Sequence, residues 1–150
     1  MKSPVLLIVA TLTAISAWAT DVAGTVKSVK GHAHIERGNA RIDVAIGTHL
    51  QRQDRLVSGP ASSVGVTLSD STLLTAGPNS TIELSQYAFD RSTRAGHMDT
   101  TVRRGTLAVV SGQLAKSQPN QVVFRTSTVT LGVRGTEFII DVDASTKSTP

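Results

Sequence analysis

The chain has 150 residues, no cysteine, and a formal charge of +4 with a sequence pI near 10.0. Its length suits one domain around a single core. The absence of cysteine excludes disulfides, cysteine-ligated zinc and cysteine nucleophiles. The basic residues are dispersed, and Arg103 and Arg104 form the only adjacent pair. This distribution favours a solvated basic surface and argues against a nucleic-acid-binding patch.

Residues 1–19 predict a secretory signal peptide. Lys2 supplies a basic start, residues 5–14 are an apolar run, and Ala17 and Ala19 are the small residues that a signal peptidase reads. The alternative is an uncleaved membrane anchor, but the run is shorter than the roughly 20 residues that span hydrocarbon. Cleavage takes away one lysine, so the remaining 131 residues carry a formal charge of +3. We therefore expect an exported protein without a transmembrane anchor after cleavage.

Residues 20–143 predict one all-β domain of many short strands. Segments rich in Val, Ile, Leu and Thr alternate apolar and polar residues between Gly, Pro, Asn and Asp turns, as half-buried strands do. No segment has helical spacing over three turns, so we expect at most one helical turn, near residues 85–89. The alternating segments are Ala33/Ile35, Ile42/Val44/Ile46, Val64/Val66/Leu68, Ile82/Leu84 and Met98/Thr100/Val102.

Periodicity leaves the arrangement of these strands open. A sandwich, a flattened barrel and an irregular solenoid-like β-roll would all show the same alternation.

Residues 144–150 are small and polar and have no apolar anchor, which predicts a flexible tail.

Residues 128–142 contain a switch in the parity of the apolar positions. Val129, Leu131 and Val133 are odd-numbered, whereas Phe138, Ile140 and Val142 are even-numbered. Because side chains alternate between the faces of a strand, a bulge or corner at Gly135 would bring both sets to one core face. The alternative is a strand buried on both faces, which the apolar Ile139 between Phe138 and Ile140 would favour.

Candidate chemistry in the sequence is sparse. His32, His34 and Glu36 have two-residue spacing and would share one face of a strand, which could hold zinc or copper with a further ligand. A solvent-facing polar edge is the interpretation that we favour, because His49 and His97 have no fixed relation to the pair. No nucleophile elbow, phosphate-binding glycine loop or zinc-protease motif is present. We therefore expect neither catalysis nor a cofactor.

Residues 132–138 resemble the closing signature of the FecR domain, an extracytoplasmic sensor domain. Its residues here are Gly132, Arg134, Gly135, Thr136 and Phe138, for which a structural role is expected. Ser71 and Gln53 stand where that family usually has glycine. Other pieces agree in order: Gly24-Thr25-Val26, Asp54-Arg55-Leu56-Val57-Ser58-Gly59, Leu68-Ser69-Asp70-Ser71, Pro78-Asn79-Ser80-Thr81-Ile82-Glu83-Leu84, Arg104-Gly105-Thr106-Leu107 and Val110-Ser111-Gly112.

The resemblance implies an all-β domain, with a solenoid-like or rolled arrangement, in a Gram-negative-type envelope. We expect a periplasmic or secreted, non-catalytic module that binds another envelope protein, for which addition of a strand to an exposed edge is a plausible mode. The alternative is a module that binds envelope glycan or anionic lipid. Arg134 has two interpretations, a structural clamp on backbone carbonyls or Glu137, or an anchor for an acidic partner.

Processing gives the first testable prediction. The mature protein should begin at Thr20, and because the only tryptophan is Trp18, it should show tyrosine-type fluorescence. Mass spectrometry and emission spectra of protein recovered from the envelope measure this. Tryptophan emission from that sample would refute cleavage after Ala19.

Overall fold

The computed structural model describes residues 21–134 and 136–142, within which strands dominate. The strands are β1 (Val22–Lys30), β2 (Ala33–Arg37), β3 (Ala40–Asp43), β4 (His49–Gln51), β5 (Arg55–Ser58), β6 (Ser63–Leu68), β7 (Leu73–Ala76), β8 (Thr81–Phe89), β9 (Gly96–Val110), β10 (Val122–Arg125), β11 (Thr130–Gly132) and β12 (Glu137–Val142). Two short helical segments, α1 (Gln113–Ser117) and η1 (Pro119–Gln121), separate β9 from β10. The expectation of an all-β protein is confirmed.

The strands form two layers that share one strand. Sheet A has the order β4-β1-β6-β7-β9-β12, and sheet B has the order β3-β2-β5-β8-β9-β10-β11. All of these pairings are antiparallel except that between β9 and β10. Because β9 belongs to both layers, the described strands form one continuous sheet that curls back on itself.

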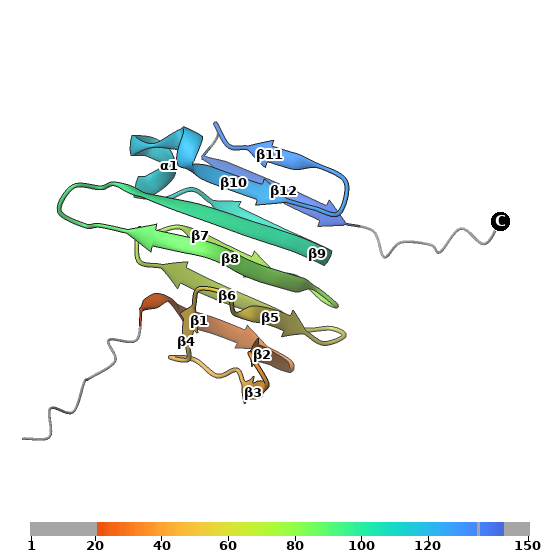
Figure 1. The fold of residues 1–150 in the computed structure, drawn as a ribbon. Helices are drawn as coiled ribbons and strands as arrows, with labels where there is room; N and C mark the ends of the chain where they lie inside the picture. Colours follow the sequence, from red (N-terminus) through yellow and green to blue (C-terminus); the bar gives the residue numbers. More distant parts are fainter. Residues whose placement is uncertain (1–20, 135, 143–150) are drawn as a thin grey trace, which may run out of the picture.

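The chain advances along the molecule as it passes back and forth between the two sheets. Figure 1 shows this progress from β1 to β4 at one end to β10, β11 and β12 at the other. Two of the three arrangements that the sequence left open, the sandwich and the roll, therefore describe different aspects of one fold. In cross-section it is a flattened sandwich, and along its length it is a roll.

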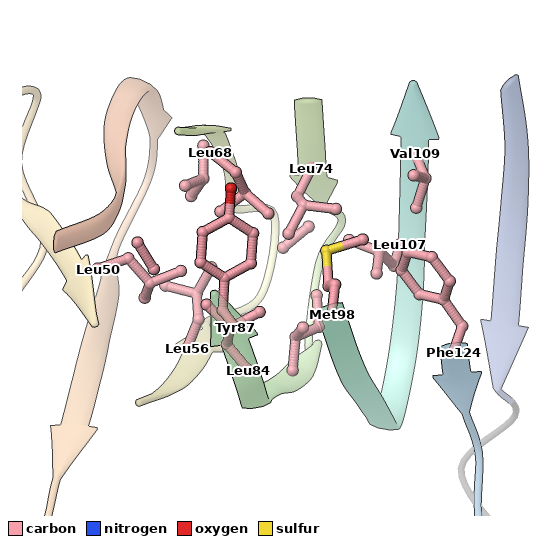
Figure 2. Packing of buried hydrophobic residues seen from close by; sticks show 14 of the residues in the cluster. Leu50, Leu56, Leu68, Leu74, Leu84, Tyr87, Met98, Leu107, Val109 and Phe124 are labelled. Carbon is pink, nitrogen blue, oxygen red and sulfur yellow. The ribbon is translucent and has the colours of Figure 1, made fainter. Parts of the chain in front are cut away.

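The core lies between the sheets and is built by simple alternation. In β6, Val64, Val66 and Leu68 are buried, whereas the residues between them are partly exposed. Sheet B contributes larger side chains, including Tyr87, Met98 and Phe124, which point toward the middle of the molecule (Figure 2). Burial of this apolar surface is the main favourable free energy of folding.

Strand β9 changes sheets at Arg104 and Gly105. Its first half pairs with β8 as far as Arg104, and its second half pairs with β12 from Gly105 onward. Gly105 has φ +83, in the left-handed region that favours glycine. Ser80 packs against this corner, where its hydroxyl accepts a hydrogen bond from the Thr106 N–H at 2.9 Å and donates one to the Thr106 carbonyl at 3.1 Å.

The helix expectation was wrong in position. Residues 85–89 continue β8, because Tyr87 is buried and pairs with Met98 of β9. In the part of the chain that the structure describes, the one α-helical turn is α1, and it buries Leu114 against the core. No helix in the described ranges is long and apolar enough to cross a bilayer.

The parity switch has a different explanation from the one that the sequence suggested. Gly135 lies outside the described residues, but β11 and β12 belong to different sheets, where β11 pairs with β10 and β12 pairs with β9. Val133, Phe138 and Ile140 turn inward, whereas Val129 and Leu131 are exposed. The two apolar sets therefore do not share one core face. Burial of β12 on both faces is also wrong, because Ile139 is 69% exposed.

Gln53 and Ser71 are two of the five described residues other than glycine with a positive φ, and both lie in exposed turns. Both have φ +69, and they are the two positions at which the resemblance described above implies glycine. A left-handed conformation costs roughly 1–2 kcal/mol for an L-residue with a β-carbon. The departures from the pattern therefore carry local strain.

Gly105→Ala is expected to lower the free energy of unfolding by about 3 kcal/mol, measured by urea denaturation. An added β-carbon would have to adopt a positive φ and would lie 2.5 Å from the Ser80 Cα. Gly38→Ala is the matched control, because Gly38 has φ +58 but no atom within 4 Å of the added carbon. That control should lose only about 1 kcal/mol, so equal losses in both variants would contradict a sterically required corner.

Gln53→Gly and Ser71→Gly are each expected to stabilise the protein, by roughly 0.5–1 kcal/mol, because glycine relieves the left-handed strain. Thermal and urea unfolding measure the change. Gln51→Gly is the control, since Gln51 lies in β4, where glycine costs conformational entropy. Destabilisation by glycine at position 53 as large as that at position 51 would overturn this explanation.

Candidate functional site

Strand β12 forms one edge of sheet A. It runs antiparallel to β9, with Glu137 opposite Val110, Ile139 opposite Ala108 and Asp141 opposite Thr106. Among the described residues, β12 pairs with no other strand. In an antiparallel pair, alternate residues direct their N–H and C=O groups away from the partner strand. The outer edge of β12 can therefore accept a further strand.

The inward side of β12 fixes the strand to the core. Phe138 meets Phe124 of β10 edge to face, with ring centroids 5.2 Å apart and an interplanar angle of 81°. Such aromatic contacts add to the stabilisation from area burial. Ile140 is buried beside them. Phe138 of the signature thus packs against the core and holds β12 from its inner side.

The outward side of β12 continues into a largely uncharged surface on sheet A. Ile139 lies in a row with Ala108 and Thr75, and Glu137 lies in a row with Val110 and Leu73. Leu73 and Val110 are exposed, as is Ile139. Leucine and valine that face water on neighbouring strands form a small apolar patch, which is a common feature of interaction surfaces.

A cleft lies where β12 begins. It is lined by Ser111, Ala115, Lys116, Pro119, Arg134 and Thr136 and has a volume of about 660 Å³. The Thr136 carbonyl accepts a hydrogen bond from the Ser111 N–H at 2.7 Å, which closes the end of the β9–β12 ladder. Arg134 is exposed, and no ion pair joins it to Glu137 in the described part of the chain. The predicted clamp on Glu137 is therefore not formed.

The structure describes only one of the two glycines of the signature, Gly132. A β-carbon added to Gly132 would meet no atom within 4 Å, so sterics do not require glycine there. Gly135 lies outside the described residues.

The histidine cluster predicted from the sequence is only partly assembled. His34 and Glu36 share a face of β2, with His34 Nε2 3.4 Å from Glu36 Oε1, but His32 precedes the strand. His32 and His34 line a cleft of about 460 Å³ together with Arg41 and Asp43. Within residues 21–134 and 136–142, no group of three or more His, Asp or Glu side chains could hold a metal ion.

The outer face of sheet B carries a ladder of alternating charges. Arg55 lies 3.4 Å from Glu36 and 3.5 Å from Glu83, and Arg103 lies 2.7 Å from Glu83. A separate pair joins Arg125 to Asp99 at 2.9 Å. Paired charges on neighbouring strands stabilise the sheet modestly. They also neutralise Arg55, Arg103 and Arg125, which could otherwise attract an anionic polymer to this face.

The two buried carboxylates of the family-like motifs are structural. Asp54 accepts two hydrogen bonds from Arg37, at 2.8 and 2.7 Å. Asp70 accepts hydrogen bonds from the hydroxyls of Thr72 and Tyr87 and from the Leu114 N–H, which ties α1 to the turn between β6 and β7. Burial, reinforced by the Asp70 charge, raises the pKa of Tyr87 well above its ordinary value.

Sequence reasoning did not identify the free edge of β12 or the charge ladder as particular features. The alternation of Glu137, Ile139 and Asp141 is visible in the sequence and could have indicated a strand edge that faces solvent. The ladder joins residues far apart in the chain, so no local pattern could reveal it.

Comparison with known proteins agrees with the fold and the motifs. The family model described as "FecR protein" matches residues 54–149. No curated protein and no solved structure matches the chain. The matched family is regulatory and is associated with signalling at the cell envelope, and it is not known for enzymes. From the order of its motifs and the match over most of its length, the chain belongs to the FecR family.

Proposed function

We propose that this protein is an exported, non-catalytic binding module that docks an envelope protein on the free edge of β12. The observation that carries the proposal is the edge itself, a six-residue strand paired on one side only among the described residues. Backbone groups of such an edge provide affinity for an extended segment, and the alternating side chains provide specificity.

The surroundings of the edge support a protein partner. Leu73, Val110 and Ile139 offer apolar area beside the strand, and the cleft with Arg134 and Lys116 lies at its start. Phe138 and Ile140 anchor the strand from within, so the edge is rigid before a partner arrives. A preorganised strand loses little conformational entropy on binding.

The glycan or anionic-lipid alternative has weaker support. Arg55, Arg103 and Arg125 on the outer face of sheet B are paired with carboxylates. No stacked array of aromatic side chains is exposed in the described ranges, because Tyr87 and Phe124 are buried in the core. A protein partner therefore accounts better for the surface.

The proposal is tested with Ile139→Lys, which places a charge on the edge while leaving the core intact. The partner is first identified in cells with a photo-crosslinking residue at position 139. The same residue at position 39, in the turn between β2 and β3, serves as the reference site. The dissociation constant of the purified pair should then rise at least tenfold in Ile139→Lys, with an unchanged urea midpoint. Amide hydrogen exchange should show protection of β12 by the partner.

Ile46→Lys is the matched control, because Ile46 is 71% exposed and Ile139 is 69% exposed, and Ile46 lies far from β12 along the sheet. It should leave the affinity unchanged. Equal loss of affinity in the two variants would refute the edge as the binding site. Retention of the protein on peptidoglycan or on anionic lipid vesicles, without a protein partner, would favour the alternative function instead.

A further inference from the structure

The outward side chains of β12 form an acid–apolar–acid row on the free edge. We propose that this edge selects a partner strand with Lys or Arg opposite Glu137 and Asp141 and an apolar residue opposite Ile139. The proposal rests on the proposed function and adds the chemistry of the partner strand. It commits to a basic, β-forming segment of another protein as the occupant.

The geometry of a sheet gives this pattern its register. Glu137, Ile139 and Asp141 alternate with Phe138 and Ile140, which turn inward, so the three share the outward face. Side chains of directly opposite residues on a strand added to β12 would lie about 4.5–5.5 Å away, measured between their Cβ atoms. Three alternate residues of the partner therefore meet these three side chains.

The two carboxylates are exposed and have no ion-pair partner among the described residues. Their cross-strand neighbours in β9 are Val110 and Thr106, and no cation of the described residues pairs with either of them. Sheet B is different, since Glu36, Glu83 and Asp99 each have an arginine partner. The proposed partner therefore supplies the cations opposite Glu137 and Asp141.

A second copy of the chain fits the edge poorly. Antiparallel pairing of β12 with itself, centred on Ile139, would place Glu137 of each copy opposite Asp141 of the other. Like charges directly opposite each other destabilise a strand pair. The acidic row thus also blocks self-association through the edge, which is a recognised use of charge on exposed strands.

The start of β12 limits the length of the basic pattern. Arg134 precedes Glu137 by three residues and lines the cleft with Lys116. A cation on the partner beyond the residue opposite Glu137 would approach these two positive side chains. The basic pattern should therefore end there and be followed by a neutral or acidic residue.

Three synthetic peptides with blocked termini test the proposal against the full-length protein after export: TKTVTKT, its neutral analogue TTTVTTT and its acidic analogue TETVTET. Chemical shifts of the β12 amides, followed by NMR during titration, report binding at the edge. TKTVTKT should bind roughly tenfold more tightly than the neutral peptide, and TETVTET more weakly still. The difference should shrink as the salt concentration rises.

The double variant Glu137→Lys/Asp141→Lys should invert this order of affinities, because the edge would then carry positive charge. Both changed side chains face solvent, so the fold should be retained. Asp43→Lys, at an exposed carboxylate that ends β3, is the control that should leave the order at β12 unchanged. Circular dichroism and urea unfolding establish that each variant is folded.

Each remaining outcome has a distinct meaning. Equal binding of the three peptides at β12 would overturn the charge selection but leave the edge as a docking site. Absence of any shift in the β12 amides with all three peptides would overturn both the selection and the proposed use of the edge. Concentration-dependent shifts of β12 in the protein alone would show that a second copy occupies the edge, and would also refute the selection.

Discussion

The passage of β9 from one sheet to the other is the constraint on which the rest of the structure depends. Its two halves pair with β8 and β10 in sheet B and with β7 and β12 in sheet A, and no other described strand joins the layers. The corner at Gly105 needs a left-handed backbone and close contact with Ser80. Ser58 supports Ser80 in turn, because its hydroxyl accepts the Ser80 N–H.

The residues of the family-like motifs are scattered along the chain, but they meet in space and fix how the two sheets are arranged. Ser58, Ser80 and Thr106 meet at the corner, and Asp70 ties α1 to a turn of sheet A. Ser58, Ser80 and Asp70 are buried polar groups whose hydrogen bonds replace those lost to water. Such groups specify one arrangement of the sheets, since any other arrangement would leave them unpaired. The motifs by which this chain belongs to the family thus maintain the fold and do not form one binding site.

The two outer faces of the molecule differ in charge, and this difference directs attention to the β12 edge. Sheet B presents arginines and carboxylates that neutralise one another, whereas sheet A presents Thr, Ala and exposed apolar residues. On β12 the two properties meet, with Ile139 between two carboxylates that form no ion pair with any described residue. A surface of this kind combines apolar area, which provides affinity, with uncompensated charge, which provides selectivity.

The sequence by itself determined the all-β class, most strand positions and the family, because alternation and turn residues act over a few neighbouring positions. It misjudged residues 85–89, where pairing of Tyr87 with Met98 prevails over local preference, and it placed Val129 and Leu131 in the core. Only the tertiary structure decided that β11 and β12 belong to different sheets, that Arg55, Arg103 and Arg125 of sheet B pair with carboxylates, and that β12 pairs with one strand only among the described residues. These features depend on contacts between residues distant in the chain, and a local pattern carries no information on which strand lies beside which.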